Sequence, residues 1–351
     1  MSNSFGRLFR FTTFGESHGT AMGVVVDGCP AGVELSLEDI QKELDRRRPG
    51  QVDTASKEVL VSARNEDDTV EVLSGVYEQK TLGTPIACVV QNKNQRSQDY
   101  EEIKKSPRTG HADDVWQTKF GHADARGGGR SSGRETLSRV IAGAIAKKFL
   151  LQQYPKLQVM GFVKSIGEME LNEQELQQLR SNWLTQNQTA DQHAARFPTQ
   201  RFAIADKLLD AKKNGESYGG VVELWIEGVP ASLGEPVFYK LKNVLASAMM
   251  SIGATCGFEF GDGFAMSRQK GTTVHAVERA SPYGGIRGGI STGEPIVFRT
   301  AFKPTSSILD VAKRGRHDPC IVPRAVPVVE AMTWAVLADM TLLYSSSRIS
   351  N

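Results

Sequence analysis

The sequence predicts one domain of mixed α and β structure, residues 1–351, built from a duplicated strand–helix unit. Three pairs of similar segments predict the duplication, because they occur in the same order in the two halves of the chain. No long linker separates the halves, and one half alone would bury too little apolar surface to be stable. The composition, 40% hydrophobic and 23% charged residues, is that of a globular protein. The two halves are therefore expected to share one core.

The first pair of segments is "VDGCPAG" at 26–32 and "IEGVPAS" at 226–232, each placed between a β-branched strand and an amphipathic helix. The second pair is "SGVYEQKTLGTPI" at 74–86 and "GGIRGGISTGEPI" at 284–296. Chance similarity among turns is the alternative, because Gly and Pro are common there. The shared order favours duplication.

The third pair is a Gly-Arg loop that opens a long helix, after Gly129 and again after Gly315. The first of these helices is the clearest local pattern, and Ser132 with Glu135 spells a capping box at its start. Its apolar residues recur with the helical period on one face: Leu137, Val140, Ile141, Ala144, Ile145 and Phe149.

A hairpin is predicted around "GESHG", residues 15–19, which has the spelling of a serine-hydrolase nucleophile elbow. An elbow needs a strand, a sharp turn and then a helix. Here strand-like sequence at 7–14 is followed by three valines at 24–26 and an Asp-Gly turn, which predicts strand, turn, strand. A serine hydrolase acting through Ser17 is therefore disfavoured, and Ser17 and His18 need another role.

Residues 155–215 are polar and rich in glutamine, with helical stretches such as "NEQELQQLRSNWL". This region is expected to be a peripheral polar excursion without chemistry.

Charge and cysteine usage exclude several classes of protein. The net charge of +2 gives no support for binding to nucleic acid. No run of about 18 apolar residues predicts a membrane span, and the N-terminus lacks the apolar core of a signal peptide. The four cysteines lie far apart without a Cys-x-x-Cys pair, which indicates small buried residues rather than disulfides or a zinc site. These features predict a cytoplasmic protein.

The stretch "DARGGGRSSGRE" at 124–135 places Arg126, Arg130 and Arg134 around three glycines at a helix start. Backbone N–H groups, the helix terminus and the guanidinium groups all favour a bound anion there. The loop has neither Walker A spacing nor a G-x-G-x-x-G pattern, so an ordinary nucleotide loop is disfavoured. A solvated basic helix start is the alternative, although three glycines in a row would be costly for such an element.

The corresponding loop in the second half is "RGRHDPC" at 314–320, with Arg316 and Asp318 before a helix. His111 in "RTGHADD" and His122 in "FGHAD" are further candidates for proton exchange near neutral pH. No H-x-H or H-x-x-x-H spacing occurs, so a metal site is disfavoured.

Two more clusters can be interpreted in either of two ways. "DRRRPG" at 45–50 either binds a ligand or places cations at a helix C-terminus. "AFKPTSSI" at 301–308 offers a lysine and three hydroxyls to a phosphate or ribityl chain, and is otherwise an ordinary loop. Taken with the two Gly-Arg loops and the histidines, these residues predict a small, highly anionic substrate and an acid/base elimination or transfer.

Three stretches resemble the signatures of the chorismate synthase family: "FTTFGESHG", "RGGGRSSGRETLSRVIAGAIAKK" and "KRGRHDPC" followed by "PRAVPVVEAM". Further similar blocks, among them "ELDRRRPG", "QNKNQRSQDY", "GGIRGGISTGEPI" and "FKPTSSI", follow the family's order over nearly the whole chain. The resemblance implies an α+β fold, a β-α-β sandwich with helices between two antiparallel sheets, internally duplicated with pseudo-two-fold symmetry.

The resemblance also implies the activity, a lyase reaction that is the last step of the shikimate pathway in aromatic amino acid biosynthesis. In that family 5-enolpyruvylshikimate-3-phosphate loses phosphate from C3 and a proton from C6 in an anti 1,4-elimination, giving chorismate. Reduced FMN (FMNH2) is required although the reaction is redox-neutral, and some members use NADPH as reductant. The resemblance implies a homotetramer. The lack of a separate nucleotide fold favours an external flavin reductase.

Site residues follow from the matching motifs. His18 and His111 match the family's two catalytic histidines, and Asp318 matches an aspartate that handles a flavin proton, with Ser17 and Ser132 hydrogen-bonding nearby. The residues that match FMN contacts are Arg130, Ser131, Ser132, Gly253, Ala254, Gly288, Lys303, Pro304, Thr305, Ser306, Ser307 and Arg316.

Arginines complete the predicted site. Arg47 matches the arginine linked to NADPH use in some members. Arg48 and Arg134 are candidates for the substrate's anionic groups on physical grounds rather than by resemblance. Two carboxylates and a phosphate carry about −3.5 to −4 charges, and clustered guanidinium groups can hold them.

The sequence departs from the family pattern at three informative positions. Gly253 stands where the family usually has Asn, and Tyr283 interrupts an Asn-x-Ala-Gly-Gly pattern. Asp53 follows "RRRPG" where Arg is expected, which weakens the case for a nicotinamide contact. A metal-dependent phosphohydrolase and a non-catalytic anion-binding protein are the alternatives, and the order of motifs along the whole chain argues against both.

Overall fold

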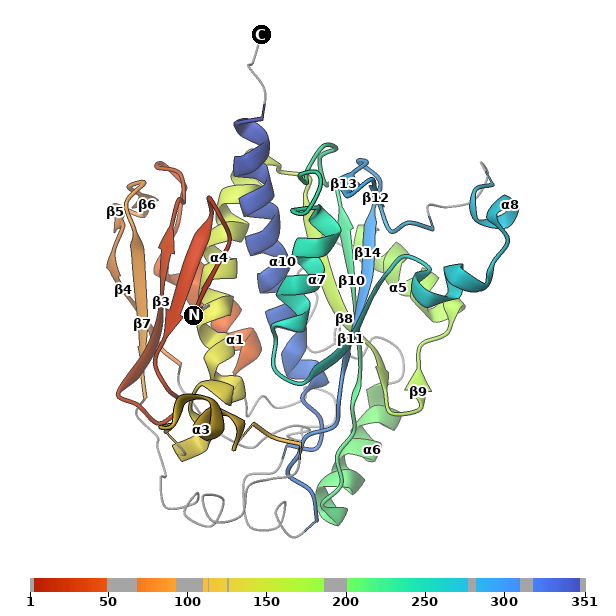
Figure 1. The fold of residues 1–351 in the computed structure, drawn as a ribbon, viewed down its shortest axis with the longest axis horizontal. Coiled ribbons are helices and arrows are strands. Elements are labelled where there is room, and N and C mark those ends of the chain that lie inside the picture. The colour runs from red at the N-terminus through yellow and green to blue at the C-terminus, as the bar shows by residue number, and fades with distance from the viewer. Residues whose placement is uncertain are drawn as a thin grey trace.

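The computed structural model places two five-stranded antiparallel sheets on either side of a layer of helices (Figure 1). This arrangement confirms the predicted α+β class with antiparallel sheets packed against helices. The residues that the structure describes are 3–48, 68–92, 110–112, 114–124, 126–185, 201–276, 282–309 and 318–347.

The first sheet has the strand order β1-β2-β3-β7-β4. β2 alternates between exposed and buried residues, so that Phe11 and Thr13 face the core, as expected for a strand with one solvated face. The turn at 15–20 joins β2 to β3, and Phe14 pairs with Gly23 across it. The predicted strand–turn–strand is therefore confirmed. The strands are β1 (Ser4–Phe5), β2 (Arg10–Phe14), β3 (Ala21–Asp27), β4 (Val70–Ser74) and β7 (Ile86–Gln91).

The second sheet has the order β11-β14-β10-β8-β9. Its strand β8 lies inside the region 155–215 that was expected to be peripheral. β8 pairs along its length with β10 and buries Phe162 and Val163, so the prediction was wrong for this part of the excursion. The strands are β8 (Gln158–Ile166), β9 (Met169–Glu170), β10 (Gly220–Glu227), β11 (Thr255–Phe260) and β14 (Ile296–Phe302).

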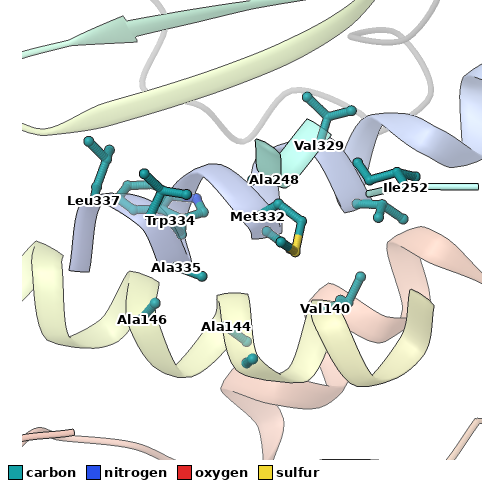
Figure 2. Close-up of a cluster of buried hydrophobic side chains, with 14 of the residues drawn as sticks. Val140, Ala144, Ala146, Ala248, Ile252, Val329, Met332, Trp334, Ala335 and Leu337 are labelled. Carbon is teal, nitrogen blue, oxygen red and sulfur yellow. The ribbon is translucent and has the colours of Figure 1, made fainter. Parts of the chain in front are cut away.

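Four helices fill the space between the sheets: α1 (Leu37–Arg47), α4 (Thr136–Gln153), α7 (Leu241–Met250) and α10 (Val322–Ser345). All six residues of the predicted apolar face of α4 are buried, which confirms that helix. α4 and α10 lie in close contact, and Figure 2 shows Val140 and Ala144 of α4 facing Met332 and Ala335 of α10. A Cβ at Gly143 would lie 2.4 Å from Ala331 Cα, so the glycine lets the two backbones approach.

The capping box predicted at Ser132 is not formed, although Ser132 caps the short 3₁₀ turn that precedes α4. The Ser132 hydroxyl accepts a hydrogen bond from the Arg134 backbone N–H at 3.3 Å, but the Glu135 carboxylate accepts from Arg139 Nε at 2.7 Å instead of turning back to Ser132. The local pattern did not anticipate that Arg139 would compete for the carboxylate.

The remaining elements are short or lie outside the sandwich. They are the hairpins β5 (Val76–Tyr77) with β6 (Lys80–Thr81) and β12 (Ile286–Arg287) with β13 (Ile290–Ser291), the helices α3 (Val115–Phe120), α5 (Glu173–Thr185), α6 (Arg201–Asn214) and α8 (Gly271–Val274), and the 3₁₀ segments η2 (Arg126–Ser131), η3 (Gly133–Glu135) and η5 (Gly263–Arg268).

Burial explains the apolar helix and the cysteines. Among the described residues, α10 is the one helix long and apolar enough to cross a membrane, and most of its apolar length is buried inside the protein, so it is a core helix. Cys29, Cys88 and Cys320 are buried free thiols, as predicted. Cys256 is exposed, contrary to the prediction, because it lies where the pairing of the edge strand β11 is interrupted.

Candidate active site

The loops that carry most of the predicted site residues gather at the end of the sandwich where α4 and α10 begin (Figure 1). Two groups of contacts define this end. One joins the β2–β3 turn to the glycine-rich loop before α4, and the other joins the segment at 110–112 to the loop after β14.

In the first group, the turn with Ser17 and His18 lies directly on the glycine-rich loop. The Ser17 hydroxyl donates to the Gly127 carbonyl at 3.0 Å and lies 3.2 Å from His18 Nδ1. A Cβ at Gly127 would lie 1.9 Å from His18 Nδ1, and Gly127 has φ +61°, so a glycine is needed on both counts. Ser17 is only 4% exposed, which agrees with a hydrogen-bonding role and not with an exposed nucleophile.

Arg130 holds this turn through hydrogen bonds from its guanidinium group. Its Nη1 donates to the Gly15 carbonyl at 3.1 Å, and its Nη2 donates to the Thr13 hydroxyl at 2.5 Å. The guanidinium group that the motif assigns to the cofactor is therefore engaged with the end of β2. Next to it, the Ser131 hydroxyl donates to the Gly128 carbonyl at 2.6 Å.

Beside this loop lies a buried ion-pair cluster. Asp68 Oδ2 pairs with Arg47 Nη2 at 2.8 Å, and Asp68 Oδ1 pairs with Arg134 Nη1 at 2.8 Å. Burial alone would raise the pKa of Asp68, but the guanidinium groups of Arg47 and Arg134 together hold it below its usual value. The Arg47 side chain is only 1% exposed, so it lies beneath the site rather than at its surface.

Asn92 joins the cluster to the turn. Its Oδ1 accepts from Arg134 Nε at 2.8 Å, and its Nδ2 donates to the carbonyls of Gly19 at 2.8 Å and Glu16 at 3.2 Å. Asn92 lies in the block "QNKNQRSQDY" that resembles the family, but neither Asn92 nor Asp68 was predicted as a site residue, because both depend on partners from distant parts of the chain.

In the second group, Lys303 brings the segment of His111 to the loop after β14. Lys303 Nζ donates to the Gly110 carbonyl at 2.9 Å and to the Ser306 hydroxyl at 3.2 Å. The Lys303 backbone N–H donates to the Ala254 carbonyl at 2.9 Å. Three predicted segments, which carry His111, Ala254 and Lys303, are thus brought together.

Asp318 lies next to this group, at the start of α10. Its backbone carbonyl accepts from the Thr305 hydroxyl at 2.9 Å, while its carboxylate accepts from Arg324 Nη1 at 2.9 Å and from the Cys320 N–H at 3.2 Å. In this arrangement the carboxylate holds the loop just before the helix to the Arg324 side chain of its first turn. Arg316 lies outside the described residues.

Arg139 links the two groups. It pairs with Glu135 through Nε at 2.7 Å, and its Nη2 donates to the Ser251 carbonyl at 2.9 Å, next to the loop with Gly253 and Ala254. No described atom lies within 4 Å of the place of a Cβ at Gly253 or Gly288.

Other predicted residues take less informative places. Arg48 is partly exposed at the end of α1, with Nη1 3.9 Å from Asp45. Pro304 is exposed, and Ser307 is half-buried. Tyr283 contacts His275, and Asp53 lies outside the described residues.

These residues fit a flat cofactor that carries a phosphate. The loop 303–307 offers an ammonium group and hydroxyls to an anion or a polyol, and Gly253 leaves space beside the backbone where a ring can approach. The structure does not bring Gly288 to this place, because the turn between β12 and β13 lies beside the start of α7 and Gly253 follows the end of that helix. Within the described part of the chain, no group of three or more His, Cys, Asp or Glu residues could hold a metal ion.

Comparison with known proteins gives a consistent result. The family model for chorismate synthase matches residues 9–342. The chorismate synthase of Bdellovibrio bacteriovorus is 55% identical over 349 residues, covering 99% of each chain, and that of Synechocystis sp. is 47% identical, again over 99% of each. A crystal structure of a chorismate synthase superimposes with a TM-score of 0.74 at 33% identity and covers 97% of this chain and 94% of that one.

Proposed function

This chain belongs to the chorismate synthase family, and from that premise we propose how its own residues carry out the reaction. The enzyme is a lyase that converts 5-enolpyruvylshikimate-3-phosphate to chorismate in the shikimate pathway. The family generally depends on reduced FMN.

We propose that His18 and His111 are the acid/base residues. The contact of the His18 imidazole with the Gly127 backbone is the observation that carries this proposal, because it fixes a proton-carrying ring against an anion-binding loop. His18 would donate a proton from its imidazole to the leaving phosphate or the flavin, and Ser17 would hold the imidazole through Nδ1. His111, held beside Lys303 through Gly110, would be the second acid/base residue of the elimination.

We propose that the cofactor lies against the loops of Gly253 and Lys303, with Ser306 and Ser307 on its phosphate or ribityl chain. Gly288 lies beside the start of α7, at the other end of that helix from Gly253, so we do not place it against the same cofactor within one chain. When bound, reduced FMN supplies transient electron density to the substrate without net oxidation. Its family contacts at Arg130, Ser131 and Ser132 would come from the backbone side of the glycine-rich loop, because the Arg130 guanidinium is engaged with Thr13 and Gly15. Arg316 and Pro304 complete the proposed set, with Asp318 at the flavin.

Arginines at this end would hold the substrate's anionic groups. Arg48 is exposed enough to reach a ligand. Arg134 is 10% exposed and already paired with Asp68, so we propose that it contributes mainly by lowering the electrostatic cost of a nearby anion. The burial of Arg47 argues against direct contact with a nicotinamide ring. We therefore propose that an external reductase supplies reduced flavin and that NADPH does not bind at Arg47.

We further propose that the chain is one domain formed by duplication. The order β2-β3-β7-β4 in one sheet corresponds to β8-β10-β14-β11 in the other. The side-chain contacts repeat as well: the Thr81 hydroxyl donates to the Pro30 carbonyl at 2.6 Å, and the Ser291 hydroxyl donates to the Pro230 carbonyl at 2.6 Å. Both halves contribute to one continuous apolar core, which supports a pseudo-two-fold arrangement.

A homotetramer and a cytoplasmic location are the remaining proposals. Of the helices that the structure describes, α1 and α4 pack on one face of the first sheet (Figure 1). Phe14 and Leu73, on two strands of that sheet, have exposed side chains, which supports contact between copies. Light scattering on the purified chain would give the mass of the assembly, and a monomer would contradict this proposal.

One assay tests the catalytic proposal against its alternatives. The chain is mixed anaerobically with chemically reduced FMN and 5-enolpyruvylshikimate-3-phosphate, without added metal, and chorismate is followed by absorbance. We expect chorismate and phosphate in equal amounts. Free phosphate without chorismate, abolished by a chelator, would indicate a metal-dependent phosphohydrolase, and binding without turnover would indicate a non-catalytic anion-binding protein.

A further inference from the structure

Asn92 occupies a junction between three parts of the active-site end. It follows β7 directly, and its backbone N–H donates to the Thr20 carbonyl at 3.0 Å, which ties it to the start of β3. Its side chain then reaches in two directions, toward the carbonyls of Glu16 and Gly19 and toward the guanidinium group of Arg134. Those two carbonyls flank Ser17 and His18 in the chain.

The geometry requires an amide at this position. Two carbonyl oxygens need a donor, and a guanidinium N–H needs an acceptor, so the two ends of one small planar group must differ. A carboxylate in the same place would keep the contact with Arg134 but would set an oxygen against the carbonyls of Glu16 and Gly19. A shorter apolar side chain would lose both contacts.

The turn is thus held from two sides. On one side the Ser17 hydroxyl donates to Gly127 of the glycine-rich loop, and on the other side Asn92 holds the two flanking carbonyls. Arg134 is fixed in turn by Asp68 at 2.8 Å, and the Asp68 side chain is fully buried. A continuous series of contacts therefore runs from Asp68 through Arg134 and Asn92 to the backbone of the turn.

We propose that Asn92 is a positioning residue for the known reaction, which fixes the His18 imidazole and the Arg134 guanidinium in one mutual arrangement. Asn92 acts through His18, so this inference rests on the proposed role of His18 as an acid/base residue. Its contribution is orientation: a proton donor displaced by a fraction of an ångström loses rate while the substrate still binds.

The test compares Asn92→Asp with Asn243→Asp as the matched control. Asn243 also donates through its side-chain amide to a backbone carbonyl, that of Phe238, but on the exposed surface of α7. With reduced FMN under anaerobic conditions, we expect kcat of Asn92→Asp to fall at least about ten-fold while KM changes by less than about three-fold. Asn243→Asp should behave as the wild type in both. An unchanged kcat in Asn92→Asp would overturn the proposal.

A double-mutant cycle with His18→Ala separates this inference from the proposed function. If Asn92 acts through His18, Asn92→Asp should cost little further rate in the His18→Ala background. An equal loss in both backgrounds would show that Asn92 acts independently of His18 and would overturn the inference alone. Wild-type turnover in His18→Ala would overturn the role of His18 itself.

A measurement that does not depend on turnover distinguishes a displaced His18 from a variant that is only less stable. Nitrogen NMR of the free enzyme, with His18 assigned by its absence in His18→Ala, reports the tautomer and the pKa of its imidazole. We expect both to change in Asn92→Asp and to stay unchanged in Asn243→Asp. If Asn92→Asp does not fold, Asn92→Ala replaces it with the same expectations, and an unperturbed His18 signal in a folded variant contradicts the proposal.

Discussion

At Gly127 the backbone of the glycine-rich loop lies against the His18 imidazole. The role of His18 can therefore be tested by adding a single methyl group at position 127. In Gly127→Ala the new Cβ would lie 1.9 Å from His18 Nδ1, so the ring must move. We expect kcat to fall at least about ten-fold, within the range found when a general acid is lost or displaced.

The control for Gly127→Ala is Gly121→Ala. Gly121 also has a positive φ, +72°, but no described atom lies within 4 Å of its Cβ position. Both variants carry similar backbone strain, on the order of 1 kcal/mol, and only one displaces His18. Steady-state kinetics and melting temperature distinguish the two effects. Equal losses of rate in both variants would show that strain alone is responsible.

His111 gives the second prediction for a single residue. We expect His111→Ala to lower kcat by about 10² to 10⁴-fold, the usual contribution of a positioned general acid or base, with little change in substrate affinity. Anaerobic kinetics with reduced FMN measure kcat, and equilibrium titration measures binding. The exposed residue His122 provides the control, since His122→Ala should retain wild-type turnover. Near wild-type rate in His111→Ala would remove this histidine from the mechanism.

The residues that could be predicted from the sequence are those in motifs. Ser17, His18 and the glycine-rich loop were predicted because each lies in a short sequence motif, and the structure brings them into contact. Asp68 has no local pattern, and Asn92 lies in the family-like block "QNKNQRSQDY", where nothing indicates its role. Each is defined by hydrogen bonds to guanidinium groups or carbonyls from other elements, and such partners are visible only after the chain has folded.

Among the elements, α4 and the β2–β3 hairpin could be predicted because their periodicity is complete within one stretch of sequence. β8 could not, because its segment "QVMGFVKSI" adjoins a glutamine-rich region and its buried face is specified by β10, far along the chain. The close contact between α4 and α10 could not be predicted either. The need for a glycine at position 143 becomes visible only once Ala331 of the facing helix is in place.

At this helix contact we expect a Gly→Ala substitution to destabilise the protein, the opposite of its usual effect inside a helix. In an ordinary helix interior, Gly→Ala stabilises by up to about 1 kcal/mol. In Gly143→Ala the added methyl would lie 2.4 Å from Ala331 Cα, so α4 and α10 must separate, and we expect a loss of about 1–3 kcal/mol in the free energy of unfolding. Urea denaturation measures this loss. Gly271→Ala in α8, where the nearest atom is at 3.7 Å, should change stability by less than about 0.5 kcal/mol, and a more stable Gly143→Ala would contradict the close contact.

At the scale of the whole molecule, a series of charged groups connects the central helices to the second sheet. Glu43 of α1 pairs with Lys147 of α4 at 2.7 Å and with Arg46 at 2.6 Å. Arg46 pairs in turn with Glu330 of α10 at 2.5 Å, and Glu330 accepts from the Gly161 N–H of β8 at 2.8 Å. Breaking one member of such a buried series leaves its partners uncompensated, so the packing of both halves depends on it.

The pKa of Glu43 makes this dependence measurable. Burial alone would raise it, but the charges of Arg46 and Lys147 prevail and lower the pKa of Glu43 to about 2. Because the folded value lies below the ordinary value of 4.5, the ionised carboxylate stabilises the fold above about pH 4.5. That contribution is lost as the pH falls toward 2.

We therefore expect Glu43→Gln to be less stable than the wild type at pH 7, by on the order of 2 kcal/mol, and the two proteins to converge between about pH 4.5 and 2. Urea denaturation at several pH values gives both curves, and their difference cancels the other groups that titrate in acid. Glu34→Gln, at an exposed glutamate before α1, should run parallel to the wild type over the same range. A constant difference between Glu43→Gln and the wild type from pH 7 to pH 3 would mean that neutral glutamine loses packing rather than charge, and that the carboxylate does not hold the helices to the second sheet.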